Sequence, residues 1–117
     1  MNTQEWKKKI ETLKHKDTTY DKEYRELMEK HNTYVNKKKN VDQQLYELTQ
    51  PAAMNAYARS PKGYSDKMTK LQNSSIKLAN MIQKTEIECN VIMRKIMENK
   101  KQLRNANLAI ECMRTTI

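Results

Sequence analysis

Hydrophobic residues recur at alternating intervals of four and three positions along two long stretches of the chain. This spacing is typical of the seam of a coiled coil, the stripe along which two helices pack. Most seam positions in residues 64–117 are apolar. The full set of these positions is Tyr64, Met68, Leu71, Ser75, Leu78, Ile82, Thr85, Cys89, Ile92, Ile96, Asn99, Leu103, Ala106, Ile110, Met113 and Ile117. One stripe is too narrow to form a core alone, so the pattern predicts a partner helix.

That partner helix is predicted in residues 3–49, where the same spacing starts at Trp6. It continues through Ile10, Leu13, Asp17, Tyr20, Tyr24, Leu27, His31, Tyr34, Lys38, Val41, Leu45 and Leu48. Residues 50–63 contain Pro51, Pro61 and Gly63, which favour a connector between the two arms. Because a short connector returns the chain antiparallel, the sequence predicts an all-α fold, a single antiparallel coiled-coil hairpin over residues 1–117.

The ends of the predicted helices carry capping signals. Asn2 or Thr3 is expected to cap the first arm, and Ser65 with Asp66 the second. The alanine-rich residues 52–58 predict a short helical turn inside the connector.

Folding the chain about Ala56 predicts the register of the hairpin. The expected pairs include Leu48 with Tyr64, Tyr24 with Cys89, and Trp6 with Ala106. This register leaves an apolar overhang without a partner in the same chain, formed by Ile110, Met113 and Ile117.

Several seam positions are polar, and they weaken the pairing while fixing its register. They include Asp17, Lys38, Ser75, Thr85 and Asn99. Replacing Asn99 with leucine is therefore predicted to raise the melting temperature.

The chain has a formal net charge of +9, and the charge is uneven. Residues 1–50 carry eleven Lys/Arg against nine Asp/Glu, whereas residues 51–117 carry twelve against five. A basic balance favours an acidic partner. At the open end of the predicted hairpin the basic residues are Lys7, Lys8, Lys9, Lys100, Lys101, Arg104 and Arg114.

Two further sets of residues are candidates for contact with partners. Ile87, Val91 and Met97 fall on the outer face of the second arm, interleaved with basic residues, and contiguous exposed apolar surface usually marks an interaction site. The alternative is that they are exposed singly, which is normal for a protein surface. A second set lies near the connector and consists of Tyr46, Met54, Tyr57 and Tyr64.

No grouping of residues indicates catalysis, a metal or a cofactor. His15 and His31 are far in sequence from both cysteines, and one glycine cannot build a phosphate-binding loop. Cys89 and Cys112 are 23 residues apart on one predicted helix, about 35 Å, too far for a bridge within the chain. We therefore expect a protein that is not an enzyme, has reduced thiols and is located in the cytoplasm.

Membrane insertion and nucleic-acid binding are not favoured. No run approaches the roughly 18 apolar residues of a membrane-spanning helix. The consecutive lysines at residues 7–9 and 37–39 wrap around the helix instead of forming one basic stripe, and the tyrosines of the first arm lie mostly at or beside the seam.

The chain resembles the FliJ/YscO family, the central stalk proteins of flagellar and injectisome type III export ATPases. The resemblance covers two long heptad arms, a brief connector and a basic balance. It is closest in the second arm, where residues 85–89 (Thr-Glu-Ile-Glu-Cys) precede Ile92, Ile96 and Leu103 at seam spacing.

The resemblance implies a non-catalytic stalk that stands in the pore of a hexameric secretion ATPase, stimulates ATP hydrolysis and links it to the export gate or to chaperones. The open end of the hairpin would enter the pore, with its basic residues and its apolar overhang against the ring. Two alternatives stay open: a general scaffold or chaperone hairpin that binds partner helices, and a basic nucleic-acid-binding coiled coil. Whether the hairpin is monomeric or opens into a dimer is also open, because both use the same seam.

Overall fold

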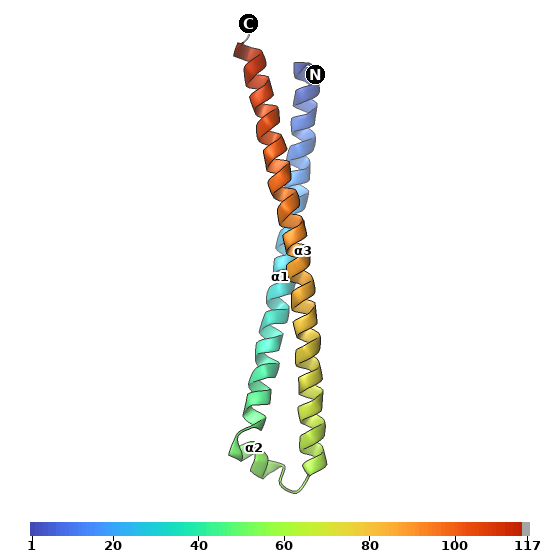
Figure 1. The fold of residues 1–117 in the computed structure, drawn as a ribbon, viewed down its shortest axis with the longest axis vertical. Helices are drawn as coiled ribbons and strands as arrows, with labels where there is room; N and C mark the ends of the chain where they lie inside the picture. The colour runs from blue at the N-terminus through green and yellow to red at the C-terminus, as the bar shows by residue number, and fades with distance from the viewer. Residues whose placement is uncertain (116–117) are drawn as a thin grey trace. The chain divides into compact units, whose positions relative to one another are not determined.

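The computed structural model describes residues 1–115 and contains three helices, α1 (Thr3–Leu48), α2 (Pro51–Ala56) and α3 (Pro61–Thr115) (Figure 1). All regular secondary structure within residues 1–115 is helical, and α1 packs against α3 in the opposite chain direction. The predicted all-α hairpin is confirmed. Ile117, which belongs to the predicted seam, overhang and pore-binding set, lies outside the described residues.

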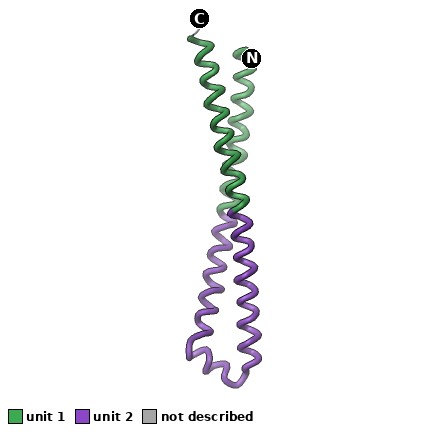
Figure 2. Tube along the Cα trace, viewed as in Figure 1, with its two compact units in different colours: residues 1–28, 87–117 green, residues 29–86 purple. Residues whose placement is uncertain are grey.

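The contacts divide the chain into two units (Figure 2). The terminal unit comprises residues 1–28 and 87–117, and the connector unit comprises residues 29–86. Each unit contains one segment of α1 and one segment of α3, so each has a seam of its own.

The predicted seam positions face the inside of the hairpin in both units. Every one of them from Trp6 to Leu48 and from Tyr64 to Met113 is buried or half-buried. In the terminal unit, Ile10, Leu13, Ala106 and Ile110 form a buried cluster. Trp6 and Leu103 pack against this cluster, so Trp6 lies beside the segment of α3 that carries Ala106 and Ile110.

The first helix begins as its capping residues predict. The side-chain Oδ1 of Asn2 accepts a hydrogen bond from the backbone N–H of Glu5 at 2.9 Å, and the carbonyl of Asn2 accepts one from Trp6 at 3.1 Å. Asn2 is therefore the N-cap, and it satisfies a donor that the helix start would leave without a partner.

The connector forms the predicted short helix, with Pro51 at its start. Gln50 before it has the extended conformation that a following proline favours (φ −84°, ψ 150°). The Tyr57 and Tyr64 rings then meet edge to face, with centroids 5.8 Å apart. The Tyr64 hydroxyl donates to the carbonyl of Leu48 at 2.7 Å, which confirms that predicted pair.

The predicted start of the second arm at residue 64, with Ser65 and Asp66 as its cap, is wrong. Helix α3 begins at Pro61, and Ser60 Oγ accepts a hydrogen bond from the Gly63 N–H at 3.3 Å. Proline suits the first helical position because its missing N–H would have no helical acceptor there. A Cβ on Gly63 would lie 2.6 Å from Ser60 Oγ, so the glycine leaves room for the capping hydroxyl.

The predicted overhang is also wrong for Ile110 and Met113. In the terminal unit the Cys89 Sγ lies 3.7 Å from the Met28 Sδ, one helical turn beyond the predicted partner Tyr24. This shift brings Ile110, which is 8% exposed, into the core cluster. It also places the Met113 sulfur 4.0 Å from the Thr3 hydroxyl.

Candidate protein-interaction surfaces

The terminal unit has a groove of about 630 Å³ between its two helical segments. It is lined by Lys7, Arg104, Asn107, Leu108, Ile110, Glu111 and Arg114. Three of these side chains are cationic and one is anionic. Four of the residues for which the family resemblance implies a pore contact therefore lie together here, namely Lys7, Arg104, Ile110 and Arg114.

No ion pair among residues 1–115 neutralises the cations of this groove. Within residues 1–115 the structure contains one ion pair, and it joins Lys38 to Asp42 in the connector unit. Ile110 and Leu108 add apolar surface, although Ile110 contributes only a small exposed part. The groove therefore offers positive charge beside apolar surface, a combination suited to a carboxylate-bearing protein segment.

The remaining predicted basic residues of the open end do not line the groove. Lys8, Lys9, Lys100 and Lys101 are all exposed on the helices. The Lys9 ammonium lies 5.2 Å from the centre of the Trp6 ring, close enough for a cation–π contact.

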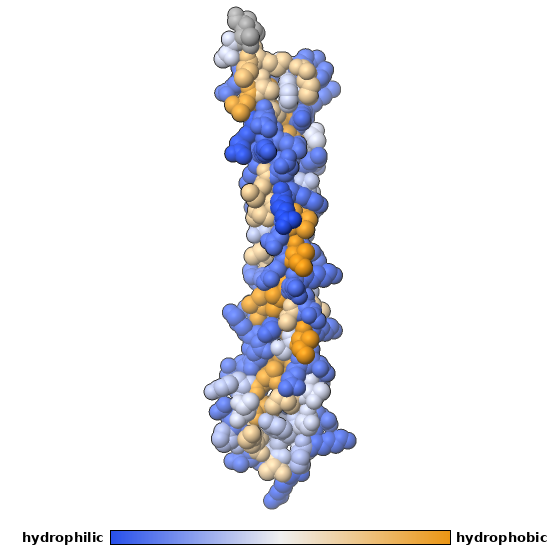
Figure 3. Space-filling model, viewed as in Figure 1, coloured by the Kyte–Doolittle hydropathy of each residue, from blue (hydrophilic) through white to orange (hydrophobic). Residues whose placement is uncertain are grey.

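The outer face of α3 carries large exposed hydrophobic side chains in the terminal unit. Ile87 is 58% exposed, Val91 43%, and Met97 64%. This placement agrees with the predicted outward direction of all three residues. A space-filling view shows separate hydrophobic patches among hydrophilic surface (Figure 3).

Near the connector the four predicted contact residues divide into two kinds. Tyr46 and Met54 are exposed and remain available to a partner. Tyr57 and Tyr64 are half-buried against each other, and the Tyr64 hydroxyl is used within the fold. The prediction that these two rings are presented to a partner is therefore not supported by their placement.

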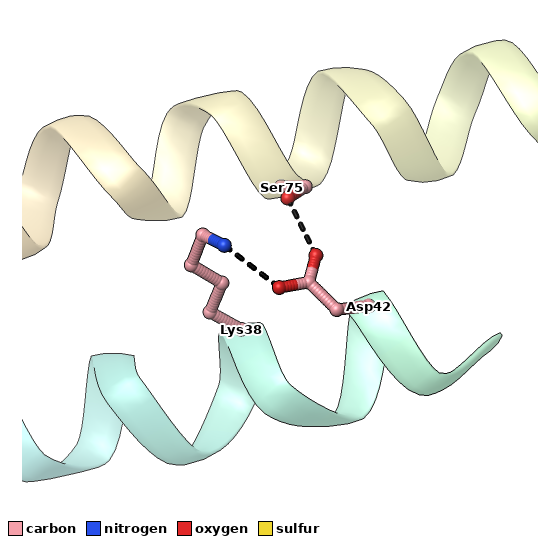
Figure 4. A network of polar contacts seen from close by, with 3 residues as sticks. All are labelled: Lys38, Asp42 and Ser75. Carbon is pink, nitrogen blue, oxygen red and sulfur yellow. Dashed lines mark hydrogen bonds and ion pairs between the residues drawn. The ribbon is translucent and has the colours of Figure 1, made fainter. Parts of the chain in front are cut away.

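The connector unit joins its helices with polar side chains (Figure 4). Asp42 accepts hydrogen bonds from Lys38 Nζ and from Ser75 Oγ, each at 2.7 Å. The bond from Lys38, with the bond from Ser75 second, holds the pKa of the Asp42 carboxyl below its ordinary value. His31 Nδ1 lies 3.1 Å from the Thr85 hydroxyl, a second polar contact between the two helices.

Sequence reasoning missed Asn107, Leu108 and Glu111 as lining of the terminal groove. The sequence does contain an indication for Leu108, because it is a large apolar residue that does not belong to the seam. Asn107 and Glu111 have none, because ordinary polar residues on a helix surface become groove lining only when the register brings α1 beside them.

No three His, Cys, Asp or Glu side chains within residues 1–115 are arranged to hold a metal ion. Over the same residues, no helix has the length and apolar character needed to cross a membrane. Comparisons with protein-family models, with curated proteins and with solved structures found no match to this chain.

Proposed function

We propose that this chain is a non-catalytic helical hairpin that binds an acidic protein through the groove of its terminal unit, and that the partner is the hexameric ATPase of a type III secretion system. In this proposal the chain hydrolyses nothing itself. It acts as a central stalk and changes the turnover of the ring that it enters.

The observation that carries the proposal is the groove lined by Lys7, Arg104 and Arg114. Three cations against the single carboxylate of Glu111 give it a net positive charge. Carboxylates that line a pore would pair with the guanidinium groups, which bind carboxylates through two parallel hydrogen bonds. Exposed Leu108 supplies an apolar contact beside them.

A stalk of this kind works by asymmetry. Six identical subunits present six equivalent surfaces, but a single hairpin has no sixfold symmetry. Binding stabilises the arrangement of ring subunits that has the highest affinity for the groove. The hairpin can stimulate ATP hydrolysis only as far as it binds this arrangement more tightly than the others. An export gate or a chaperone could then contact the exposed Tyr46 and Met54 of the connector unit.

The proposal is tested by ATP turnover of a purified type III secretion ATPase from the same organism, with and without this chain. Stimulation is expected, and the variant Lys7→Glu/Arg104→Glu/Arg114→Glu should abolish it. Unchanged turnover with the wild-type chain would exclude the stalk. If the chain binds the ring without changing the rate, a scaffold is the better description.

A matched control separates the groove from net charge. Arg25, Arg59 and Lys67 are exposed and lie outside the groove, so Arg25→Glu/Arg59→Glu/Lys67→Glu makes the same change in charge. This control is expected to retain most of the stimulation. Equal losses in both triple variants would mean that charge alone attracts the ring, and the groove would lose its assigned role.

A further inference from the structure

The outer face of α3 in the terminal unit carries a second stripe with the period of the hairpin seam. Ile87, Arg94, Lys101 and Leu108 follow one another at intervals of seven residues. Val91 and Met97 flank this column, and all six side chains are exposed. We call these six residues the outer stripe.

The outer stripe is not a general property of this hairpin. In residues 3–28, the segment of α1 in the same unit, no large hydrophobic side chain is exposed. Four are exposed in the outer stripe, among them Ile87 at 58% and Leu108 at 56%. Four exposed apolar side chains on this helix, in patches separated by hydrophilic surface, and none in residues 3–28 indicate a binding face, since isolated exposed residues would fall on both helices.

We infer that the outer stripe binds an acidic amphipathic α-helix of a partner protein. A seven-residue period keeps a stripe facing a neighbour only when that neighbour is another helix lying along it. Ile87 and Leu108 are separated by 21 residue steps along the helix, a length of about 32 Å, or nearly six helical turns of a partner.

The charges of the outer stripe determine the chemistry of the partner. Arg94 and Lys101 stand between the apolar ends, and the nearby Glu98 carboxylate accepts a hydrogen bond from the Gln102 side chain at 3.4 Å. The complementary helix has apolar residues near its two ends and Glu or Asp in its middle, so that each cation meets a carboxylate.

The same charges disfavour two other occupants of the stripe, a second copy of this chain and a nucleic acid. A second copy of this chain would place its own Arg94 and Lys101 against those of the first, and like charges across an interface are destabilising. A nucleic acid would pair its phosphates with the cations but would leave Ile87, Val91 and Leu108 without an apolar partner. An acidic amphipathic helix offers both carboxylates for the cations of the outer stripe and apolar side chains for its hydrophobic residues.

This inference does not depend on the proposed stalk function. Leu108 also lines the groove of the terminal unit, but Ile87, Val91 and Arg94 do not. Variants at these three residues therefore test the outer stripe and leave the groove intact.

The experiment uses the full chain and a synthetic helical peptide. The peptide carries leucines at the outer positions of a seven-residue repeat and glutamates at the central positions, and a fluorophore reports binding by anisotropy. The charge-reversed peptide, with lysines at the central positions, is the first control. The acidic peptide is expected to bind at least about tenfold more tightly, with an affinity that falls as salt is added.

Two pairs of variants assign that binding to the stripe. Ile87→Ser/Val91→Ser should weaken it about tenfold or more, whereas Ile76→Ser should not, although Ile76 is 62% exposed on the same helix. Arg94→Glu should also weaken binding of the acidic peptide, and it should strengthen binding of the lysine peptide. Arg25→Glu, an exposed arginine on α1, should do neither.

Four results would overturn the inference. They are no binding of the acidic peptide at about 1 mM, equal binding of the lysine peptide, an equal loss in the Ile76→Ser control, and concentration-dependent dimerisation of the chain that Ile87→Ser/Val91→Ser removes. The last would show that a second copy covers the face. Loss of ATPase stimulation in the groove variants, with peptide binding retained, would confirm that the two surfaces act separately.

Discussion

The terminal unit and the connector unit share one four–three seam pattern, but different side chains fill it. Of the described seam residues, eight are buried in the terminal unit: Ile10, Leu13, Cys89, Ile92, Ile96, Asn99, Ala106 and Ile110. In the connector unit only Leu48 and Thr85 are buried. The connector unit instead joins its helices through polar contacts, Ser75 with Asp42 and His31 with Thr85.

The difference shows that a shared spacing does not imply shared energetics. Burial of apolar side chains stabilises in proportion to the area removed from water. A hydrogen bond between polar side chains replaces bonds to water and adds much less, but it requires particular partners. We therefore expect the terminal unit to supply most of the stability and the connector unit to contribute mainly to the choice of register.

The largest expected effect is that of Leu13→Ala. Leu13 is 3% exposed in the core cluster, and its truncation should lower the free energy of unfolding by about 2–3 kcal/mol. Leu45→Ala, at a half-buried seam position of the connector unit, should cost about half as much or less. Urea denaturation followed by circular dichroism compares them. Equal losses would remove the distinction between the two units.

Hydrogen exchange tests the same comparison without a mutation. Backbone amides of α3 in residues 92–103 should exchange about tenfold more slowly than those in residues 68–78, because opening the terminal unit exposes more apolar surface. Exchange measured by mass spectrometry resolves these segments. Faster exchange in residues 92–103 would contradict the proposed division of stability.

Asn99→Leu should raise the stability by about 1 kcal/mol. The Asn99 side-chain nitrogen donates to the carbonyl of Leu13 at 2.7 Å inside the buried seam. That carbonyl keeps its helical hydrogen bond when the asparagine is removed, so leucine adds apolar burial and leaves no orphaned acceptor. Thermal melting checks the direction.

Asn99→Ala is the control for this change. It removes the hydrogen bond without adding apolar surface, so it should lower the melting temperature. If Asn99→Leu also lowers the melting temperature, the bond from Asn99 to Leu13 contributes more than the apolar contact that replaces it.

The smallest expected effect is that of Ser75→Ala, a loss of about 0.5 kcal/mol at neutral pH, because the Asp42 side chain is 43% exposed and solvent screens the contact. The pKa of Asp42 is lowered in the folded chain. Its contribution is therefore fully present above about pH 4 and is lost as the pH falls through the lowered pKa. Melting curves of both proteins should differ at pH 7 and converge in acid.

A matched variant tests the cause of this pH dependence. Asp42→Asn removes the titrating group, so Ser75→Ala in the Asp42→Asn background should show the same small effect at every pH. A difference that still shrinks in acid would assign the pH dependence to another group.

The sequence alone determined the two long helices, their antiparallel pairing and which seam side chains face inward. Apolar side chains at seam spacing must leave water, and a short connector between the two seams returns the chain antiparallel. The outward placement of Ile87, Val91 and Met97 follows from the same periodicity. The short helix of the connector was also readable, from the alanine-rich residues 52–58.

Only the tertiary structure decided the register, the cap of α3 and the groove. A seam that repeats every seven residues lets two helices slide with little change in apolar contact, so cross-helix partners such as Met28 with Cys89 select one alignment. That alignment buries Ile110, which the sequence left as an overhang, and brings Lys7 to the same groove as Arg104 and Arg114. Ser60 caps α3 in place of Ser65, because Pro61 can begin a helix and Gly63 leaves room for the hydroxyl. Spacing along one helix fixes which side faces inward, but only contact between two helices fixes what each residue meets.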